Sequence, residues 1–294
     1  MRSRRWLWPA AACLMWAGGC AHANYTSPER YERGLVVCLS GSGRMMNEIR
    51  DIRRGLAEGG VDCAIETFEW SRFMLDLTSV ERKKELASRL ARRIETYQKV
   101  YPGRPVHLVG VSSGAGLVVW ALENLAPGHR VTSAVLIASS LSRTYDLTAA
   151  LGRLDGFAYN FHSPMDMVSG ASVVVRTVDG RHGVASGLSG FVPPDGADER
   201  ARAVYDEKLV QVGWTPADTL TGNVGDHLGA TRPTYVRKHI APLVRGDRDR
   251  GGDVPHPPAS AGPPIDRPAA LPYGDAERGS ALPLKTKPDT RSKR

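Results

Sequence analysis

The sequence predicts an α/β protein built on a mostly parallel six-stranded sheet with helices on both faces. Two observations support this fold class. From Gly34 onward, short apolar segments alternate with amphipathic ones, which is typical of strands separated by helices. The apolar segments also read as continuous runs, as expected for strands that are buried on both faces of a parallel sheet. Residues 34–244 are long enough to form one such domain with a substantial core.

The expected elements follow one another in order. The predicted strands cover residues 35–39, 63–70, 107–111, 131–137, 157–162 and 172–178. The predicted helices cover residues 47–59, 79–101, 115–125 and 234–244. Helix 47–59 has its apolar residues on one face and stops at Gly59-Gly60, and helix 79–101 is amphipathic up to Pro102.

One strand-to-helix turn carries a serine between two glycines, in the sequence Gly110-Val-Ser112-Ser-Gly114. In that setting, G-x-S-x-G indicates a nucleophile elbow, a sharp turn that exposes the serine hydroxyl at the end of the sheet. A side chain at either glycine would collide with the neighbouring strand or helix. The following helix points its free N–H groups at the serine, where acyl transfer develops negative charge. A purely structural turn is the alternative interpretation.

A nucleophilic serine needs a histidine to take its proton and an acid to orient that histidine. His227 lies in a glycine-flanked loop before the last predicted helix and is the candidate base. His239 falls inside that helix and His256 in the C-terminal tail, so both are weaker candidates. Asp166, just after the fifth strand, is the candidate acid, and Asp179 is its alternative.

Small residues follow the first strand in Ser40-Gly-Ser-Gly43. Such residues let backbone N–H groups approach a substrate oxygen closely. We therefore assign the two oxyanion-hole donors to the backbone amides of Ser42 and Ser113, with Gly41 as the alternative to Ser42.

These segments, together with Ser163-Pro-Met-Asp166 and Gly225-Asp-His227, resemble the α/β-hydrolase superfamily, and most of all the small hydrolases found with envelope signals in bacteria. The resemblance covers residues 34–244 and has the superfamily's order of serine, acid and histidine. It implies a serine hydrolase that forms an acyl-enzyme on Ser112 without a cofactor. A carboxylic ester, small-molecule or lipid-like, is the expected substrate, although amide, thioester and acyl-transfer chemistry would use the same groups.

Two departures from the superfamily pattern are visible. Ser40-Gly41 stands where its oxyanion loop has His-Gly, and we expect no counterpart of the N-terminal antiparallel strands of the full fold before residue 35. The short connection 138–156 leaves little space for a large helical lid. The glycine-rich segment 181–203 is the expected wall of the site mouth.

Two other functions stay open at this point. A non-catalytic envelope protein could use the same fold as a binding scaffold. Gly110, Gly114 and Gly116 also fit the glycine pattern of short-chain dehydrogenases, but no Tyr-x-x-x-Lys pair follows to carry a proton. No group of His, Cys and acidic residues has the spacing of a metal site.

Residues 1–23 are expected to be an export signal, with three arginines followed by an apolar run that is too short to span a bilayer. Ala17-Gly-Gly-Cys20 resembles a lipoprotein signal, which makes Cys20 a lipidation candidate and predicts a membrane-anchored envelope protein. Ala21-His-Ala23 also fits ordinary signal cleavage, so a soluble exported protein is the alternative.

The end of the chain differs in composition from the rest. Residues 246–294 hold nine of the twenty prolines and many charges of both signs, and we expect them to be disordered. The net charge of +8 would become +5 once the three signal arginines are removed. The basic residues do not alternate with aromatic ones as they do in many nucleic-acid-binding surfaces, so the charge predicts no nucleic-acid partner. The sequence does not indicate an oligomeric state.

Overall fold

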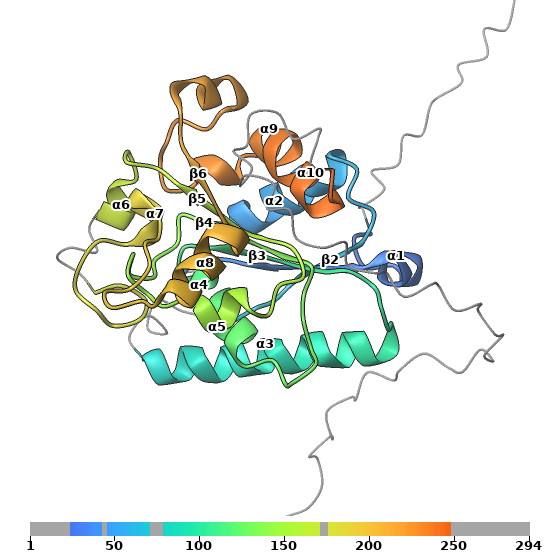
Figure 1. The fold of residues 1–294 in the computed structure, drawn as a ribbon. Helices are drawn as coiled ribbons and strands as arrows, with labels where there is room; N and C mark the ends of the chain where they lie inside the picture. The colour runs from blue at the N-terminus through green and yellow to red at the C-terminus, as the bar shows by residue number, and fades with distance from the viewer. Residues whose placement is uncertain (1–23, 43–45, 71–78, 171–175, 248–294) are drawn as a thin grey trace, which may run out of the picture. The chain divides into compact units, whose positions relative to one another are not determined.

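The computed structural model describes residues 24–42, 46–70, 79–170 and 176–247. In these ranges six strands form one sheet in the order β2-β1-β3-β4-β5-β6, and every neighbouring pair is parallel (Figure 1). The strands are β1 (Leu35–Leu39), β2 (Ala64–Thr67), β3 (Val106–Val111), β4 (Ser133–Ile137), β5 (Ala158–His162) and β6 (Leu209–Gly213). The α/β class and the six-stranded parallel sheet are thus confirmed.

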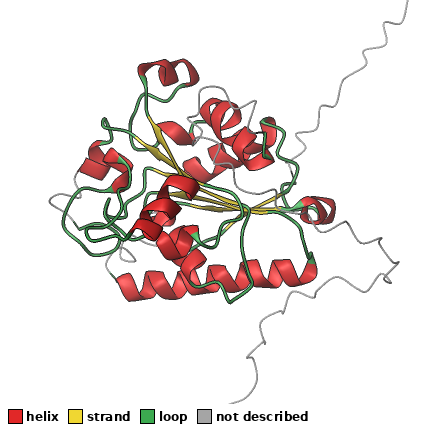
Figure 2. Cartoon of the chain, viewed as in Figure 1, coloured by secondary structure: helices red, strands yellow, loops and turns green. Residues whose placement is uncertain are grey.

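Helices cover both faces of this sheet (Figures 1 and 2). One face packs against α3 (Val80–Val100), α4 (Ser113–Glu123), α5 (Thr148–Leu151) and α8 (Glu199–Lys208). The other packs against α2 (Met46–Glu58), α9 (Pro233–Tyr235), the π-helical η5 (Val236–Ile240) and α10 (Ala241–Arg245). Shorter elements are α1 (Pro28–Arg33), α6 (Met167–Gly170), α7 (Ser186–Ser189) and the 3₁₀ turns η3 (Pro216–Thr221) and η4 (Gly229–Thr231).

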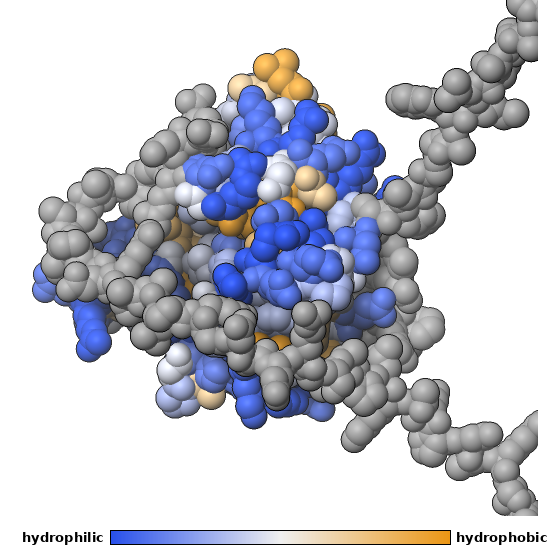
Figure 3. Space-filling view, turned by 90° about the vertical axis from the view of Figure 1, so that its right-hand side faces the viewer, coloured by the Kyte–Doolittle hydropathy of each residue, from blue (hydrophilic) through white to orange (hydrophobic). Residues whose placement is uncertain are grey.

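The two-layered core follows from the alternation of side chains along each strand. In β1, Leu35 and Val37 pack into the layer under α3 and α4, whereas Val36 and Cys38 pack into the layer under α2. All five residues of β1 are fully buried, because the strand lies inside the sheet with a helical layer on each side. Among the coloured residues on the face in Figure 3, apolar ones form small groups between hydrophilic ones.

The sixth strand differs from the one expected. Positions 172–175 of the predicted strand 172–178 lie outside the described residues, and 176–178 form loop and turn. The sixth strand is β6, which pairs with β5 from Leu209 opposite Ala158 to Gly213 opposite His162. It has the half-buried alternation of an edge strand, with Val210 and Val212 buried and their neighbours less so. That short period-two pattern was the available sequence signal.

The cysteines of the sheet are two free, buried thiols. The parallel register pairs Leu35 with Ala64 and Cys38 with Thr67, so Cys63 lies near the opposite end of its strand from Cys38. This separation is too large for a disulfide bond.

The predicted signal segment 1–23 with Cys20, and residues 248–294 of the predicted tail, lie outside the described residues. Among the helices that are described, none combines the length and the apolar character needed to cross a membrane.

A buried histidine in the centre of the sheet makes stability depend on pH. His107 on β3 pairs through Nδ1 with the Ser133 hydroxyl at 2.8 Å, and burial lowers the pKa of His107 to about 4 from its ordinary 6.5. The unfolded chain binds a proton at this ring near pH 6.5, and the folded chain only near pH 4. The stabilisation from the neutral ring is therefore complete above pH 6.5 and is lost as the pH falls toward 4.

We predict that His107→Asn removes the part of the pH dependence of stability that comes from this ring. Between pH 7 and 4, the free energy of unfolding should fall by about 3 kcal/mol more in the wild type than in the variant, the linkage value for a shift of this size. Urea unfolding at a series of pH values, followed by circular dichroism, measures both curves. Parallel curves would contradict the prediction.

Candidate active site

Ser112 occupies a strained turn between β3 and α4. Its backbone has φ 54° and ψ −119°, a conformation that residues with a side chain rarely adopt. The turn is held on both sides, since the Ser112 N–H donates to the Ile137 carbonyl at 2.8 Å and the Ser112 carbonyl accepts from the Ser140 N–H at 3.2 Å. The strain is the geometry of a nucleophile elbow, and it lifts the hydroxyl away from the sheet.

The two glycines of the motif are required by close backbone contacts. A Cβ at Gly110 would lie 2.6 Å from the Gly114 carbonyl oxygen, and a Cβ at Gly114 would lie 2.4 Å from the Ser40 carbonyl oxygen. The predicted collision with the helix at the first glycine, and with the neighbouring strand end at the second, is confirmed. Gly114 thereby lets the segment after β1 lie directly against the first turn of α4.

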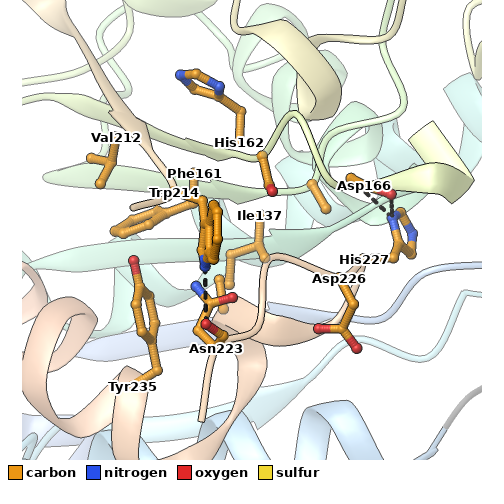
Figure 4. A pocket seen from close by; sticks show the side chains of 13 residues that line it. Ile137, Phe161, His162, Asp166, Val212, Trp214, Asn223, Asp226, His227 and Tyr235 are labelled. Atoms are coloured by element: carbon orange, nitrogen blue, oxygen red, sulfur yellow. Dashed lines mark hydrogen bonds and ion pairs between the residues drawn. The ribbon is translucent and has the colours of Figure 1, made fainter. Parts of the chain in front are cut away.

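Asp166 and His227 form a hydrogen-bonded pair at the carboxyl end of the sheet (Figure 4). His227 Nδ1 lies 2.8 Å from one carboxylate oxygen of Asp166 and 3.0 Å from the other. A carboxylate only accepts hydrogen bonds, so Nδ1 carries the proton and Nε2 of the neutral ring is left as a proton acceptor. This is the tautomer that a general base for a serine needs.

Asp166 is held as a buried anion. It is 1 % exposed, and it accepts bonds from the Ser169 N–H at 2.8 Å and the Ser169 hydroxyl at 2.6 Å. Burial acts to raise the pKa of Asp166, but the bonds from His227 and Ser169 outweigh it and keep the pKa below its ordinary value. The carboxylate is therefore ionised at neutral pH and can orient the imidazole.

The loop that carries His227 is rigidly built. The Asn223 side-chain oxygen accepts the Gly225 N–H at 3.0 Å, and the Trp214 indole N–H donates to the Asn223 carbonyl at 2.9 Å (Figure 4). Gly225 has φ 84°, and a Cβ there would lie 3.1 Å from Met165, so the loop packs directly against the loop of the acid. These contacts fix where the imidazole lies.

Ser112 and His227, both described, do not hydrogen-bond to each other in this structure. The Ser112 hydroxyl pairs instead with the Ser140 hydroxyl at 2.8 Å. Gly41, which lies against Ser112, donates its N–H to the buried carboxyl group of Glu48, and the charge of His227 acts to lower the pKa of that carboxyl group. Catalytic hydrogen bonds are often formed only with substrate present.

The residues assigned to the oxyanion hole are adjacent. The Ser42 hydroxyl donates to the Ser113 hydroxyl at 2.7 Å, which joins the two segments that would supply the amides. Ser113 is the first residue of α4, so its N–H has no acceptor within the helix. The N–H of Gly41, the alternative donor, is already bonded to Glu48 at 2.9 Å.

Asp179, the alternative acid, lies in another hydrogen-bonding group. Its two carboxylate oxygens accept from the N–H and the hydroxyl of Ser142, each at 3.0 Å, and one of them pairs with Arg181 at 3.7 Å. The structure thus brings Asp166, and not Asp179, to His227. Asp226, next to His227 in sequence, is exposed and pairs with Arg232 at 3.8 Å.

A pocket lies behind the acid–base pair, between the ends of β4 to β6 and the His227 loop (Figure 4). Asp166 and His227 border one end, and the aromatic rings of Phe161, Trp214 and Tyr235 line the other. Within the described parts of the chain, no group of three or more His, Cys, Asp or Glu side chains could hold a metal ion.

Sequence reasoning missed several polar residues around this site. Ser140, Trp214, Asn223 and Glu48 come from four separate segments, and none belongs to a motif. Glu48 in the first turn of an amphipathic helix looks like an ordinary helix-start residue. The one hint in the sequence that Glu48 is buried is its position next to Ile49, on the otherwise apolar side of that helix.

No protein-family model and no curated protein matches the chain. Among solved structures, it is similar to a cutinase-like protein from Cryptococcus sp., with 15% identity and a TM-score of 0.40 over 74% of this chain and 96% of that one. It is also similar to a lipase-esterase related protein from Clostridium acetobutylicum, with 9% identity and a TM-score of 0.37 over 73% and 95%. Both likenesses are remote. The chain's own coordinates show an all-parallel sheet and a strained serine turn between β3 and α4.

The close contact at Gly114 leads to a stability prediction. Gly114→Ala should lower the free energy of unfolding by about 3 kcal/mol, because the added methyl group meets backbone that cannot move aside. Gly103→Ala is the control: it has φ 71° but open space around it, and should cost about 1 kcal/mol for the backbone conformation alone. Urea unfolding measures both values, and equal losses would contradict the contact.

The pairing of Asp166 with His227 leads to a kinetic prediction. Asp166→Asn should lower the turnover of an ester substrate by about 10⁴-fold without unfolding the protein, because the amide no longer holds the required tautomer. Asp179→Asn should reduce stability through its bonds to Ser142 and leave turnover within a few-fold. Steady-state kinetics on the two variants compares them; loss of turnover only in the Asp179 variant would reassign the acid.

Proposed function

We propose that the protein is a serine hydrolase that cleaves a carboxylic ester through an acyl-enzyme on Ser112. One observation carries the proposal: a strained elbow serine and a bonded Asp166–His227 pair lie at the same end of one parallel sheet. A structural turn would not require the strain at Ser112, and a surface histidine would not require a carboxylate that is 1 % exposed. Together the serine, the histidine and the carboxylate supply the nucleophile, the base and the orienting acid that acyl transfer needs.

The proposed reaction proceeds in two halves. The Ser112 oxygen bonds to the ester carbonyl carbon while His227 Nε2 takes the hydroxyl proton. The carbonyl oxygen becomes an oxyanion that the amides of Ser42 and Ser113 stabilise. The tetrahedral intermediate then collapses, and the alcohol leaves with the proton from His227. In the second half, His227 takes a proton from a water molecule, whose oxygen bonds to the carbonyl carbon of the acyl-enzyme. The carboxylic acid is then released, and His227 returns the proton to the Ser112 oxygen.

Apolar side chains exposed near the acid and base support an ester with an apolar part. Met165, Met167 and Val168 follow the acid strand, and Val224 lies in the loop of the base, each more than half exposed. Large exposed apolar side chains that gather at a site commonly contact a ligand. We therefore propose a small-molecule or lipid-like ester as the substrate class.

We also propose that the protein is exported to the bacterial cell envelope and anchored in its membrane through a lipid on Cys20, with soluble export as the alternative. The support is the sequence pattern of residues 1–23.

One observation favours a second function, that of a non-catalytic binding protein. The Ser112 hydroxyl is bonded to Ser140 and not to His227 in this structure. A scaffold that never used Ser112 as a nucleophile could keep that bond permanently.

Covalent labelling separates the two functions. We predict that a fluorophosphonate probe labels the wild-type protein at Ser112 and that p-nitrophenyl esters of graded acyl length are hydrolysed, with longer acyl chains preferred over acetyl. Ser112→Ala should lose both the labelling and about 10⁶-fold of turnover, because a triad without its nucleophile retains almost no catalysis. Mass spectrometry of the labelled peptide identifies the site.

Ser113→Ala is the matched control in the same turn. It keeps the backbone amide and should remain labelled, although it loses the bond from Ser42. A folded wild-type protein that is neither labelled nor active would contradict the hydrolase and favour the scaffold.

A further inference from the structure

Glu48, in the first turn of α2, is a buried carboxyl group that the proposed reaction does not use. It is 3 % exposed, and its Oε1 accepts the Gly41 N–H at 2.9 Å. Its other oxygen is buried too and has no hydrogen-bond partner within the part of the chain that the structure describes. Leaving one such oxygen unpaired costs free energy, so the carboxyl group needs a physical explanation.

Packing alone does not explain it. A leucine would occupy a similar volume without the cost of removing a carboxyl group from water. Burial raises the pKa of Glu48, while the Gly41 N–H and the charge of His227 act in the opposite direction. What the carboxyl group adds to the fold is therefore its bond to Gly41.

Gly41 lies between Glu48 and the nucleophile. A Cβ built on Gly41 would be 3.2 Å from the Ser112 Cβ, 3.7 Å from the Ser112 Oγ and 3.7 Å from the Glu48 Oε1. The next residue, Ser42, carries the amide assigned to the oxyanion hole. The bond from Glu48 thus acts on the peptide immediately before the one that must point at the substrate.

The three residues after β1 are each held by a different element. The Trp70 indole N–H donates to the Ser40 carbonyl at 2.9 Å, Glu48 accepts from Gly41, and the Ser42 hydroxyl donates to Ser113. Oxyanion donors work because their directions are set before the reaction begins. Glu48 holds the middle of this segment, where no side chain of the segment itself could do so.

We propose that Glu48 is a positioning residue of the oxyanion hole: by accepting the Gly41 N–H, it aims the Ser42 amide at the oxygen that becomes negative in the transition state. The proposal rests on the serine-hydrolase function proposed above. It explains why Gly41 itself is not a donor to the substrate. It also predicts that the acceptor oxygen of Glu48, and not its charge, is what matters.

Two substitutions separate the acceptor from the charge. Glu48→Gln keeps an oxygen that accepts the Gly41 N–H and removes the charge, whereas Glu48→Leu keeps the volume and removes the acceptor. Glu48→Leu should lower kcat on a p-nitrophenyl ester and the rate of fluorophosphonate labelling by about 10- to 100-fold, which is less than the roughly 10²- to 10³-fold loss when an oxyanion donor is removed outright. KM should stay within about twofold, and Glu48→Gln should restore most of the loss.

The matched control is Glu58→Leu, the same change at the far end of the same helix, which should leave kcat unchanged. Circular dichroism and thermal unfolding establish that each variant is folded, and Glu48→Ala replaces the leucine variant if that one does not fold. Wild-type kcat in the leucine variant, or equal losses in the leucine and glutamine variants, would overturn the role of Glu48. A wild-type protein without labelling or turnover would overturn the proposed function and this inference with it.

Discussion

The contact between the backbone after β1 and the first turn of α4 determines how the rest of the site is arranged. At this point the Gly114 Cα lies against the Ser40 carbonyl, with no space for a methyl group between them. Because the two segments are in direct contact, Gly41 lies beside Ser112, and Ser42 can bond to Ser113. A looser contact would separate Ser112 from the backbone amides of Ser42 and Ser113.

The strained conformation at Ser112 persists because its surroundings are strongly stabilised. Helix α4 is buried along ten consecutive residues, and β3 lies inside the sheet between β1 and β4. Local strain of this kind costs about 1–3 kcal/mol, which the burial of such a helix and strand offsets many times over. The fold can thus hold a serine in an unfavourable conformation without fraying there.

Charge around the site is distributed between two carboxyl groups in different environments. Asp166 accepts several hydrogen bonds, which favour its ionised form, whereas Glu48 accepts one and is left with an unpaired oxygen. The first environment suits an acid that orients the His227 ring. The second suits a hydrogen-bond acceptor that holds the backbone at Gly41 in place.

Local patterns in the sequence predicted the order of most strands and helices, the glycines of the elbow, and Asp166 and His227 as candidates, because hydrophobic periodicity and turn chemistry are local properties. It missed β6, whose five residues alternate too briefly to stand out, and it placed a strand at 172–178, where the described residues 176–178 form loop and turn. The folded structure was needed to show that Asp166 meets His227, that Ser140 pairs with Ser112, and that Glu48 binds Gly41. Each of these contacts joins residues that are 7 to 61 positions apart, and their distances are set by how the sheet and its helices pack, which no local pattern encodes.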